Sequence, residues 1–213
     1  MSDDPGLFDI LFSTRAMRRL KPDPVPDALV ETILRAGQAA PSGGNTQSWG
    51  FLVVKDPAIK AQVQAFYQRA YDKHVGPSYA ARAEALPPGE ARERLQRQTA
   101  AVAYLTEHFH EAPVWIVACL EAGPRGATAA SGASIYPAVQ NVLLAARALG
   151  LGATLTARHM VYQKEVEAIF ALPEGIMSFA IVPIGYPMGR FGPVNRGPLA
   201  DVVHLDRWGQ QYL

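Results

Sequence analysis

Residues 113–120 constrain the fold most, because they form an unbroken apolar run rich in β-branched and aromatic side chains. Such a run predicts a strand that is buried on both faces. Residues 178–186 form a second apolar run, which also predicts a strand. Residues 134–149 predict a helix that is apolar almost all round and therefore buried on every side. This helix is too short to cross a membrane, so it is either the core helix of a large domain or part of a subunit interface.

Other helices are expected where apolar residues recur at helical spacing. They cover residues 7–12, 27–38, 58–71, 90–109 and 164–172. Short strands are expected at residues 51–54, 153–157 and 201–205.

Three segments have no such pattern. Residues 72–89 contain several prolines and predict an irregular, mobile stretch that faces substrate or is simply a disordered excursion. Residues 123–132 are small and predict a loop. Residues 187–199 are rich in proline and glycine and predict an extended tail, which needs either the domain body or a second subunit to lie on.

Charge and cysteine content exclude some classes of protein. Twenty basic and 19 acidic side chains give a formal net charge of +1, so bulk charge argues against a nucleic acid or a membrane surface as partner. The one cysteine, Cys119, lies in an apolar run, where a lone thiol is usually a small core residue. Residues 1–6 are acidic and lack a signal pattern. These features predict a soluble cytoplasmic protein.

A basic cluster near the N-terminus is a candidate phosphate site. Arg15, Arg18, Arg19 and Lys21 fall within seven residues. Arginine forks suit a phosphate, and each charge-assisted contact is worth about 1.5–3 kcal/mol. A solvated basic turn is the alternative that this cluster alone leaves open.

Residues 39–49 are a candidate ligand cradle between a helix and a strand. Gly43 and Gly44 permit positive φ or the close approach of a planar ligand to the backbone. Asn45 and Gln47 each offer a donor and an acceptor, as the edge of a heterocycle or a sugar-like chain requires. A helix C-cap followed by an ordinary loop is the alternative.

Other chemical motifs are weak. His108 and His110 are two residues apart and point to different faces of a helix, so no metal site is predicted. Gly150 and Gly152 predict a helix cap rather than a dinucleotide fingerprint, because no strand precedes them and no third glycine follows in register. No nucleophile–base pair or paired-carboxylate motif is convincing.

Four pieces in order resemble the FMN-dependent nitroreductase family. They are residues 15–26, 40–49, 140–152 and 196–203, and the resemblance extends over residues 8–208. It implies an α+β fold, with a helix-flanked, mostly antiparallel sheet in an intertwined homodimer. Residues 1–213 would form a single domain whose tail, about residues 187–213, wraps the partner subunit. Two FMN sites would lie at the interface.

The resemblance also assigns cofactor-binding residues. Arg15 and Arg18 would hold the FMN phosphate and the pyrimidine side of the flavin, and Arg196 would reach the phosphate from the tail. Lining the isoalloxazine or ribityl chain, from the partner subunit, would be Pro41, Ser42, Gly43, Asn45 and Gln47. Main-chain contacts to the reactive flavin nitrogen would come from Leu155, Thr156 and Ala157.

The chain departs from the family pattern at two positions of the basic motif. Thr14 stands where many members have an arginine. Ala16 stands where they have a serine, and is still assigned to the cofactor-binding residues. Arg19 is the candidate that would compensate for lost phosphate contacts.

The implied function is an NAD(P)H oxidoreductase that passes hydride through FMN, in ping-pong fashion, to nitroaromatic, quinone-like or other small planar acceptors. A cofactor that supplies the chemistry explains the missing acid–base motif. Without a Rossmann motif, the nicotinamide would bind only transiently. Tyr71, His74 and Tyr79 are the candidate substrate residues.

Three alternatives remain open. The first is a specialised member of the same superfamily, such as a reductive dehalogenase or a flavin-cleaving enzyme. The second is a flavin-binding module without turnover, and the third is a structural dimer that has lost the cofactor.

Overall fold

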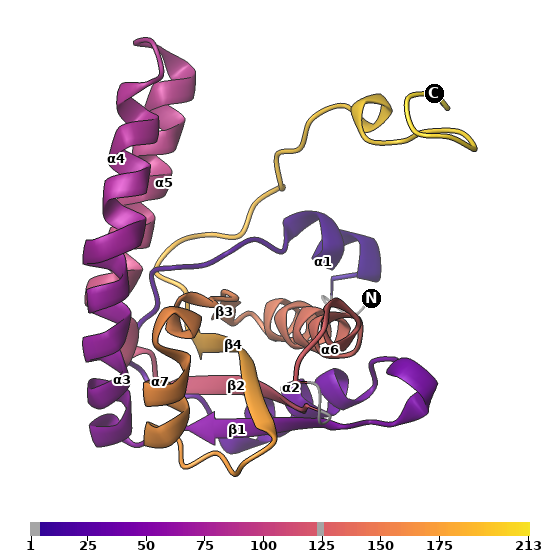
Figure 1. Cartoon of the computed structure of the whole chain (residues 1–213). Coiled ribbons are helices and arrows are strands. Elements are labelled where there is room, and N and C mark those ends of the chain that lie inside the picture. Colours follow the sequence, from indigo (N-terminus) through magenta and orange to yellow (C-terminus); the bar gives the residue numbers. More distant parts are fainter. Residues whose placement is uncertain (1–4, 123–125) are drawn as a thin grey trace.

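The computed structural model describes residues 5–122 and 126–213. Its centre is a four-stranded antiparallel sheet with the order β1-β2-β4-β3 (Figure 1). The strands are β1 (Trp49–Val54), β2 (Val114–Glu121), β3 (Gly152–Ala153) and β4 (Ile176–Gly185). All of β2 except its last residue is buried, which confirms the strand expected over residues 113–120. Its side chains alternate between two cores, one on each face of the sheet.

One face of the sheet is covered by α6 (Ala129–Ala148), with α2 (Asp27–Gln38) beside it (Figure 1). Ile135, Val139 and Val142 of α6 are at most 1% exposed. Gly37 lets the two helices approach closely, because an added Cβ would lie 3.0 Å from Val142 Cγ2. The bounds predicted for α2 are confirmed.

Two expectations about α6 were wrong. The helix begins at Ala129, inside the predicted loop, because Thr128 and Ser131 form a capping box ahead of the apolar stripe. Within one chain the helix is also not buried on every side, since Tyr136, Gln140 and Ala148 are exposed. Residues 123–125 of the predicted loop lie outside the described residues.

The other face of the sheet carries α3 (Pro57–Ala70), α5 (Glu90–Glu107) and α7 (Gln163–Ile169). Phe109 stacks between Tyr67 and Trp115, with ring centroids 4.1 and 4.2 Å apart. The Trp115 indole N–H donates to the Phe109 carbonyl oxygen at 3.0 Å. This stack is almost fully buried and holds α3 and the end of α5 against β2.

The predicted irregular stretch over residues 72–89 was wrong. A π-helical turn (Tyr71–Val75) continues α3 into α4 (Gly76–Glu84), and α5 returns beside it, so that the pair projects from the body as a helical arm (Figure 1). Pro77 lies in the first turn of α4, directly after the π-helical turn, at a position where a helix tolerates proline. The connection between α4 and α5 is short and contains Pro87 and Pro88.

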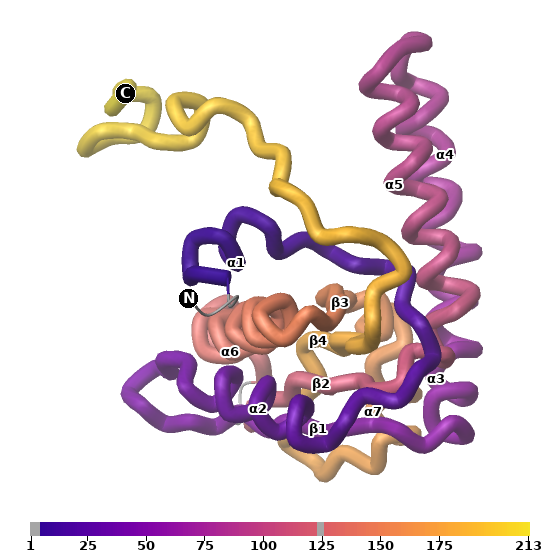
Figure 2. The backbone as a smooth tube through the Cα atoms, turned by 180° about the vertical axis from the view of Figure 1, so that it is seen from behind, coloured from indigo at the N-terminus to yellow at the C-terminus, as the bar shows by residue number. Residues whose placement is uncertain are grey.

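Both ends of the chain run over the surface. After α1 (Leu7–Ser13), the N-terminal segment lies beside the tail: Leu20 bridges to Pro187, and the Val194 N–H donates to the Phe12 carbonyl oxygen at 2.8 Å. Beyond Val194 the tail is exposed and leaves the body (Figure 2).

Two predicted short strands were wrong in extent. Residues 201–205 lack a strand partner and hold only a single bridge, between His204 and Gln211. The strand expected over residues 153–157 is reduced to β3 and an isolated bridge between Thr156 and Ile181.

Candidate functional site

A cavity of about 310 Å³ gathers residues from distant parts of the sequence. Its lining residues come from the N-terminal segment, α6, the segment around β3, and the tail: Leu11, Thr14, Arg15, Ala16, Arg18, Gln140, Leu143, Ala153, Thr154, Leu155 and Arg196. Five of the predicted cofactor-binding residues are among them, namely Arg15, Ala16, Arg18, Leu155 and Arg196. We call this space the arginine cavity.

The N-terminal segment is held in place by β3. The Met17 N–H donates to the Ala153 carbonyl oxygen at 3.0 Å, and the Met17 and Leu20 side chains are buried. A Cβ on Gly152 would lie 2.8 Å from Leu20 Cδ2, so this close approach requires glycine. Buried apolar residues that alternate with arginines therefore anchor the basic segment on the sheet.

The three arginines of the cavity are uncompensated cations. Within residues 5–122 and 126–213, no carboxylate lies within ion-pair distance of Arg15, Arg18 or Arg196. Their recorded side-chain bonds are to carbonyl oxygens, from Arg15 to Arg190 at 2.7 Å and from Arg196 to Asn195 at 2.9 Å. Three guanidinium groups around one cavity favour an anion with several oxygens.

Arg19 lines a neighbouring cavity, of about 360 Å³. This cavity shares Arg15 and Arg18 with the arginine cavity and is also bounded by Gln98 and Ala101 of α5. Its guanidinium carbon is 4.9 Å from the centre of the Tyr104 ring. The arginine predicted to compensate for the missing motif residues thus packs on α5 and does not line the arginine cavity.

The predicted cradle is a tight, irregular turn. A 3₁₀ turn spans Gly43–Asn45, and Gly44, Asn45 and Gln47 have φ of 58°, 54° and 49°. The Gly43 N–H donates to Ser134 Oγ at 3.1 Å, and the Gln47 N–H donates to Ser42 Oγ at 3.0 Å. Two non-glycine residues with left-handed φ are strained, and such strain clusters at ligand sites.

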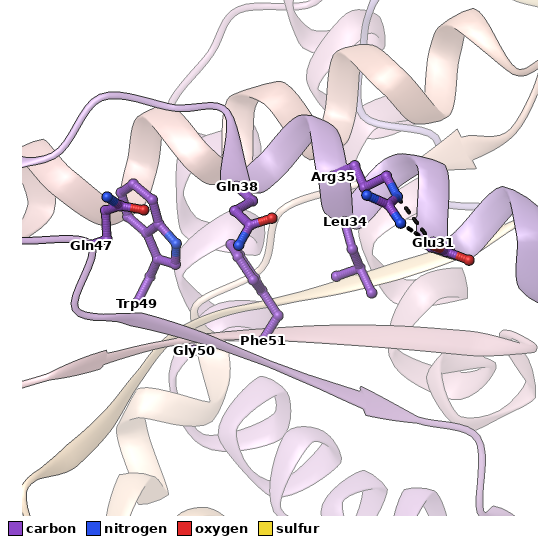
Figure 3. A pocket seen from close by; sticks show the side chains of 8 residues that line it. All are labelled: Glu31, Leu34, Arg35, Gln38, Gln47, Trp49, Gly50 and Phe51. Carbon is purple, nitrogen blue, oxygen red and sulfur yellow. Dashed lines mark hydrogen bonds and ion pairs between the residues drawn. The ribbon is translucent and has the colours of Figure 1, made fainter. Parts of the chain in front are cut away.

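One chain does not bring the cradle to the arginine cavity. Gln47 instead lines a cavity of about 470 Å³ between α2 and β1, with Trp49 and Phe51 (Figure 3). The arginine at that cavity, Arg35, is paired with Glu31 at 2.6 Å. Since its one cation is neutralised, this cavity is a poorer anion site than the arginine cavity.

Residues 155–157, which are predicted to make main-chain contacts to the flavin, have a rigid backbone. Thr156 and Ile181 exchange two backbone hydrogen bonds, at 3.0 and 2.9 Å. Thr156 Oγ1 also lies 2.9 Å from the hydroxyl oxygen of Tyr67. Burial raises the pKa of Tyr67, which keeps the phenol neutral and able to donate. Leu155 is 40% exposed, at the mouth of the arginine cavity.

The candidate substrate residues lie at the base of the helical arm. Tyr71 and Tyr79 are half-buried, whereas His74 is exposed. The Arg158 guanidinium carbon lies 5.2 Å from the centre of the Tyr71 ring. The sequence reasoning missed Arg158, because a lone arginine in an irregular segment has no periodic or spacing signal.

A polar network joins the segment that follows residues 155–157 to β4, although His159 Nδ1 is buried without a hydrogen-bond partner in the described chain. This network consists of His159, Gln163, Glu167 and Ser178, and we call it the Ser178 network. Glu167 Oε1 accepts hydrogen bonds from Gln163 Nε2, the Ser178 N–H and the Ser178 hydroxyl at 2.7–2.8 Å. The hydroxyl then accepts from His159 Nε2, 3.1 Å away. Burial lowers the pKa of His159 to about 4, although the Glu167 carboxylate opposes this shift.

Other chemistry finds little support in the described residues. They contain no group of three or more metal-ligating side chains, and His108 instead lies 3.0 Å from Glu111. Cys119 is buried, and desolvation raises its pKa to about 11, so it is a core residue as predicted. None of the described helices is long and apolar enough to span a membrane.

The fold and the cavity define a class: an α+β protein with a helix-covered antiparallel sheet and a cavity lined by three arginines. The model of the nitroreductase family matches residues 11–186. The chain belongs to the nitroreductase family.

Relatives and solved structures agree with that membership. The chain is 32% identical over 203 residues to an NADH dehydrogenase of Thermus thermophilus, covering 89% of this chain and 90% of that protein. The crystal structure of an iodotyrosine deiodinase bound to FMN and 3-iodo-L-tyrosine is similar, with a TM-score of 0.69 and 25% identity over 95% of this chain and 99% of that one.

A nitroreductase with bound FMN from Desulfitobacterium hafniense matches with a TM-score of 0.67 and 18% identity. That match covers 93% of this chain and 97% of the other, and at this identity the likeness concerns the fold alone. The fold predicted from the sequence, a helix-flanked antiparallel sheet of nitroreductase type, is confirmed.

Proposed function

We propose that the protein is an FMN-dependent NAD(P)H oxidoreductase that reduces nitroaromatic, quinone-like or other small planar acceptors. The observation that carries the proposal is the arginine cavity, where Arg15, Arg18 and Arg196 converge without carboxylate partners in the described chain. Family membership and the FMN-bound neighbours of the same fold support it.

The donor set of the cavity fits FMN. A phosphate offers several anionic oxygens, and the three arginines supply paired N–H donors for them. When bound, FMN would supply the hydride chemistry, accepting from NAD(P)H and passing to the acceptor. Arg18 would place a positive charge near the pyrimidine side of the flavin. The Thr156 N–H is already bonded to Ile181, so the backbone donors for the reactive edge would be those of Leu155 and Ala157, which this pair of bonds holds in place.

The proposal assigns the remaining cavity wall to a second copy of the chain. In one chain, Ser42, Gly43, Asn45 and Gln47 lie apart from the arginine cavity, so in a homodimer they would come, with Pro41, from the partner subunit. The chain would be one domain over residues 1–213, whose tail from about residue 187 wraps the partner.

Exposed apolar surface supports this dimer. Phe8, Phe12 and Val202 are 62–70% exposed, and Trp208 is 90% exposed. An apolar groove of about 330 Å³ also runs between α1, α2 and α6. The contrary result would be a stable, flavin-loaded monomer in analytical ultracentrifugation.

A specialised reaction is the second candidate, because the FMN-bound iodotyrosine deiodinase is similar over nearly the whole chain. Reductive dehalogenation or flavin cleavage would then replace reduction of a broad acceptor set. Comparing acceptors, and measuring oxygen-dependent flavin loss, separates these reactions. Flavin binding without steady NAD(P)H consumption would instead indicate a binding module.

The first experiment is the visible spectrum of the purified protein, followed by acid release and identification of the chromophore. We expect FMN near one equivalent per chain, with NAD(P)H consumption when a planar acceptor is added. A colourless protein that takes up no added FMN would refute the proposal.

A further inference from the structure

Arg158 is a half-buried cation beside the proposed flavin segment. It begins the 3₁₀ turn Arg158–Tyr162, directly after residues 155–157. Its guanidinium carbon lies 4.1 Å from the centre of the Tyr67 ring and 5.2 Å from that of Tyr71. Its NH1 group donates to Thr106 Oγ1 at 2.5 Å. Aromatic rings and one hydroxyl therefore hold this side chain in position.

The charge of Arg158 has no carboxylate partner among residues 5–122 and 126–213. A guanidinium has five N–H donors, and within the described residues this side chain makes one hydrogen bond, to Thr106. None of its nitrogens is among the buried atoms without a partner in the described chain, so its spare donors reach solvent-accessible space. An arginine with positioned, spare donors is suited to receive an anion.

The surroundings of Arg158 also suit a planar ring. Burial lowers the pKa of Arg158, and the nearby hydroxyls of Tyr71 and Tyr79 are among the groups that oppose this shift. These two tyrosines come from the helical arm, whereas Arg158 comes from the body. Arg18 of the arginine cavity is close enough to act on the same guanidinium in the opposite sense. The rings of Tyr67 and Tyr71 thus lie beside a cation that follows Leu155, a lining residue of the arginine cavity, by three positions in the chain.

We propose that Arg158 binds an anionic substituent of the acceptor, and that the preferred acceptors are planar aromatic carboxylates. The carboxylate would take the spare guanidinium N–H groups in a bidentate pair, and Tyr71 would flank the aromatic ring. This inference rests on the proposed function, because it assigns the acceptor of the same site. A purely structural Arg158, bracing Tyr67 and Thr106, is the competing role.

The test compares two acceptors that differ in charge but hardly in shape, 4-nitrobenzoate and 4-nitrobenzamide. Their dissociation constants are measured by isothermal titration calorimetry on the purified full-length protein, so the readout does not depend on turnover. We expect the wild type to bind the benzoate at least about tenfold more tightly, as one charge-assisted contact allows. Arg158→Gln should abolish this preference and leave benzamide affinity within about twofold.

Two further variants separate binding from bracing. Arg158→Lys keeps the charge and should restore part of the benzoate preference, which a purely structural role would not do. Arg69→Gln is the matched control, because Arg69 also lies over two rings, Phe66 and Tyr162, at 5.2 and 5.6 Å, but is exposed on α3. It should leave both dissociation constants unchanged.

Each outcome decides the inference. A wild type without benzoate preference, or without binding of either compound, overturns it, and so does an equal loss for both compounds in Arg158→Gln. If Arg158→Gln fails to fold, the inference is decided by the benzoate preference of the wild type and of Arg158→Lys. Preferential benzoate binding without NAD(P)H consumption would support the inference and refute the proposed oxidoreductase. Turnover of both compounds without a preference for the benzoate would support the proposed oxidoreductase and refute the inference about Arg158.

Discussion

The arginine cavity and the Ser178 network are two polar regions on either side of residues 154–158, and they differ in how their hydrogen bonds are satisfied. In the Ser178 network, Glu167 Oε1 accepts three hydrogen bonds from within the chain. In the arginine cavity, guanidinium groups meet no carboxylate of the described chain. The Ser178 network resembles the interior of a folded protein, whereas the arginine cavity resembles a binding site without its ligand.

Because of this difference, the two regions should contribute to different quantities, one to the stability of the fold and the other to the affinity for flavin. A network whose members hydrogen-bond to each other contributes to folding and loses part of that contribution when one member is removed, even though His159 Nδ1 has no partner in the described chain. Cations that repel one another across a cavity contribute nothing to folding until an anion arrives. Substitutions in the Ser178 network should therefore change the free energy of unfolding, and substitutions in the cavity should change flavin affinity.

Removal of the Glu167 carboxylate should have the largest effect. Glu167→Ala leaves the Ser178 N–H and the Ser178 hydroxyl without their acceptor, and Gln163 Nε2 keeps only its hydrogen bond to the Ser178 carbonyl oxygen, at 3.0 Å. We expect a loss of about 4 kcal/mol in the free energy of unfolding, from three coupled bonds to a charged group. Urea unfolding measures it, and flavin affinity of the folded fraction should stay within about twofold. A large drop in flavin affinity would break the separation between the two regions.

Stability should fall in acid because of His159. Its pKa is about 4 when folded and 6.5 as the reference for the unfolded chain, so the unfolded chain binds more protons between these values. The contribution is fully present above pH 6.5, is lost as the pH falls, and levels off below about pH 4. The slope is about 1.4 kcal/mol per pH unit, or about 3 kcal/mol in all.

His159→Gln tests this linkage, because a glutamine can still donate to Ser178 but does not titrate. The free energy of unfolding is measured for both proteins from pH 7.5 to 4. As the pH falls, the wild type should lose more of it than the variant does. Parallel pH profiles would mean that His159 is not buried in its neutral form.

The sequence predicted the fold well where an apolar pattern fits one kind of secondary structure only. The bounds of α2 follow from apolar residues at helical spacing, and the buried strand β2 follows from an unbroken apolar run. The helical arm was missed because Pro77 and the pair Pro87 and Pro88 were given the same weight, although Pro77 lies in a helical first turn. Because proline occurs both at the start of helices and after their end, its role cannot be predicted without knowing which residues surround it in the fold.

The candidate site was predictable only in part. The convergence of Arg15, Arg18 and Arg196 was expected from a resemblance, since no local pattern links Arg196 to residues that lie 181 and 178 positions before it in the chain. Arg158 escaped altogether, because its significance comes from Tyr67, Tyr71 and Thr106, which lie on other elements. Spatial neighbours, not sequence neighbours, give an arginine its role.

Arg196→Ala should weaken flavin binding about ten- to a hundredfold, through the loss of about one charge-assisted pair. Its side chain lines the arginine cavity from the tail and is exposed, so the free energy of unfolding of the flavin-free protein should not change. Flavin fluorescence titration measures the affinity. An unchanged dissociation constant would remove the tail from the site.

Arg19→Ala sharpens the comparison within the basic segment and should have the smallest effect. Arg19 is exposed and packs over Tyr104, and it lines the cavity against α5 rather than the arginine cavity. We therefore expect its flavin dissociation constant to change less than about threefold, since a screened charge in solvent adds little to binding. The same titration, run beside Arg196→Ala, provides the measurement. A tenfold loss would instead mean that Arg19 turns toward the phosphate once flavin is bound, and compensates for Thr14 and Ala16 as the motif suggested.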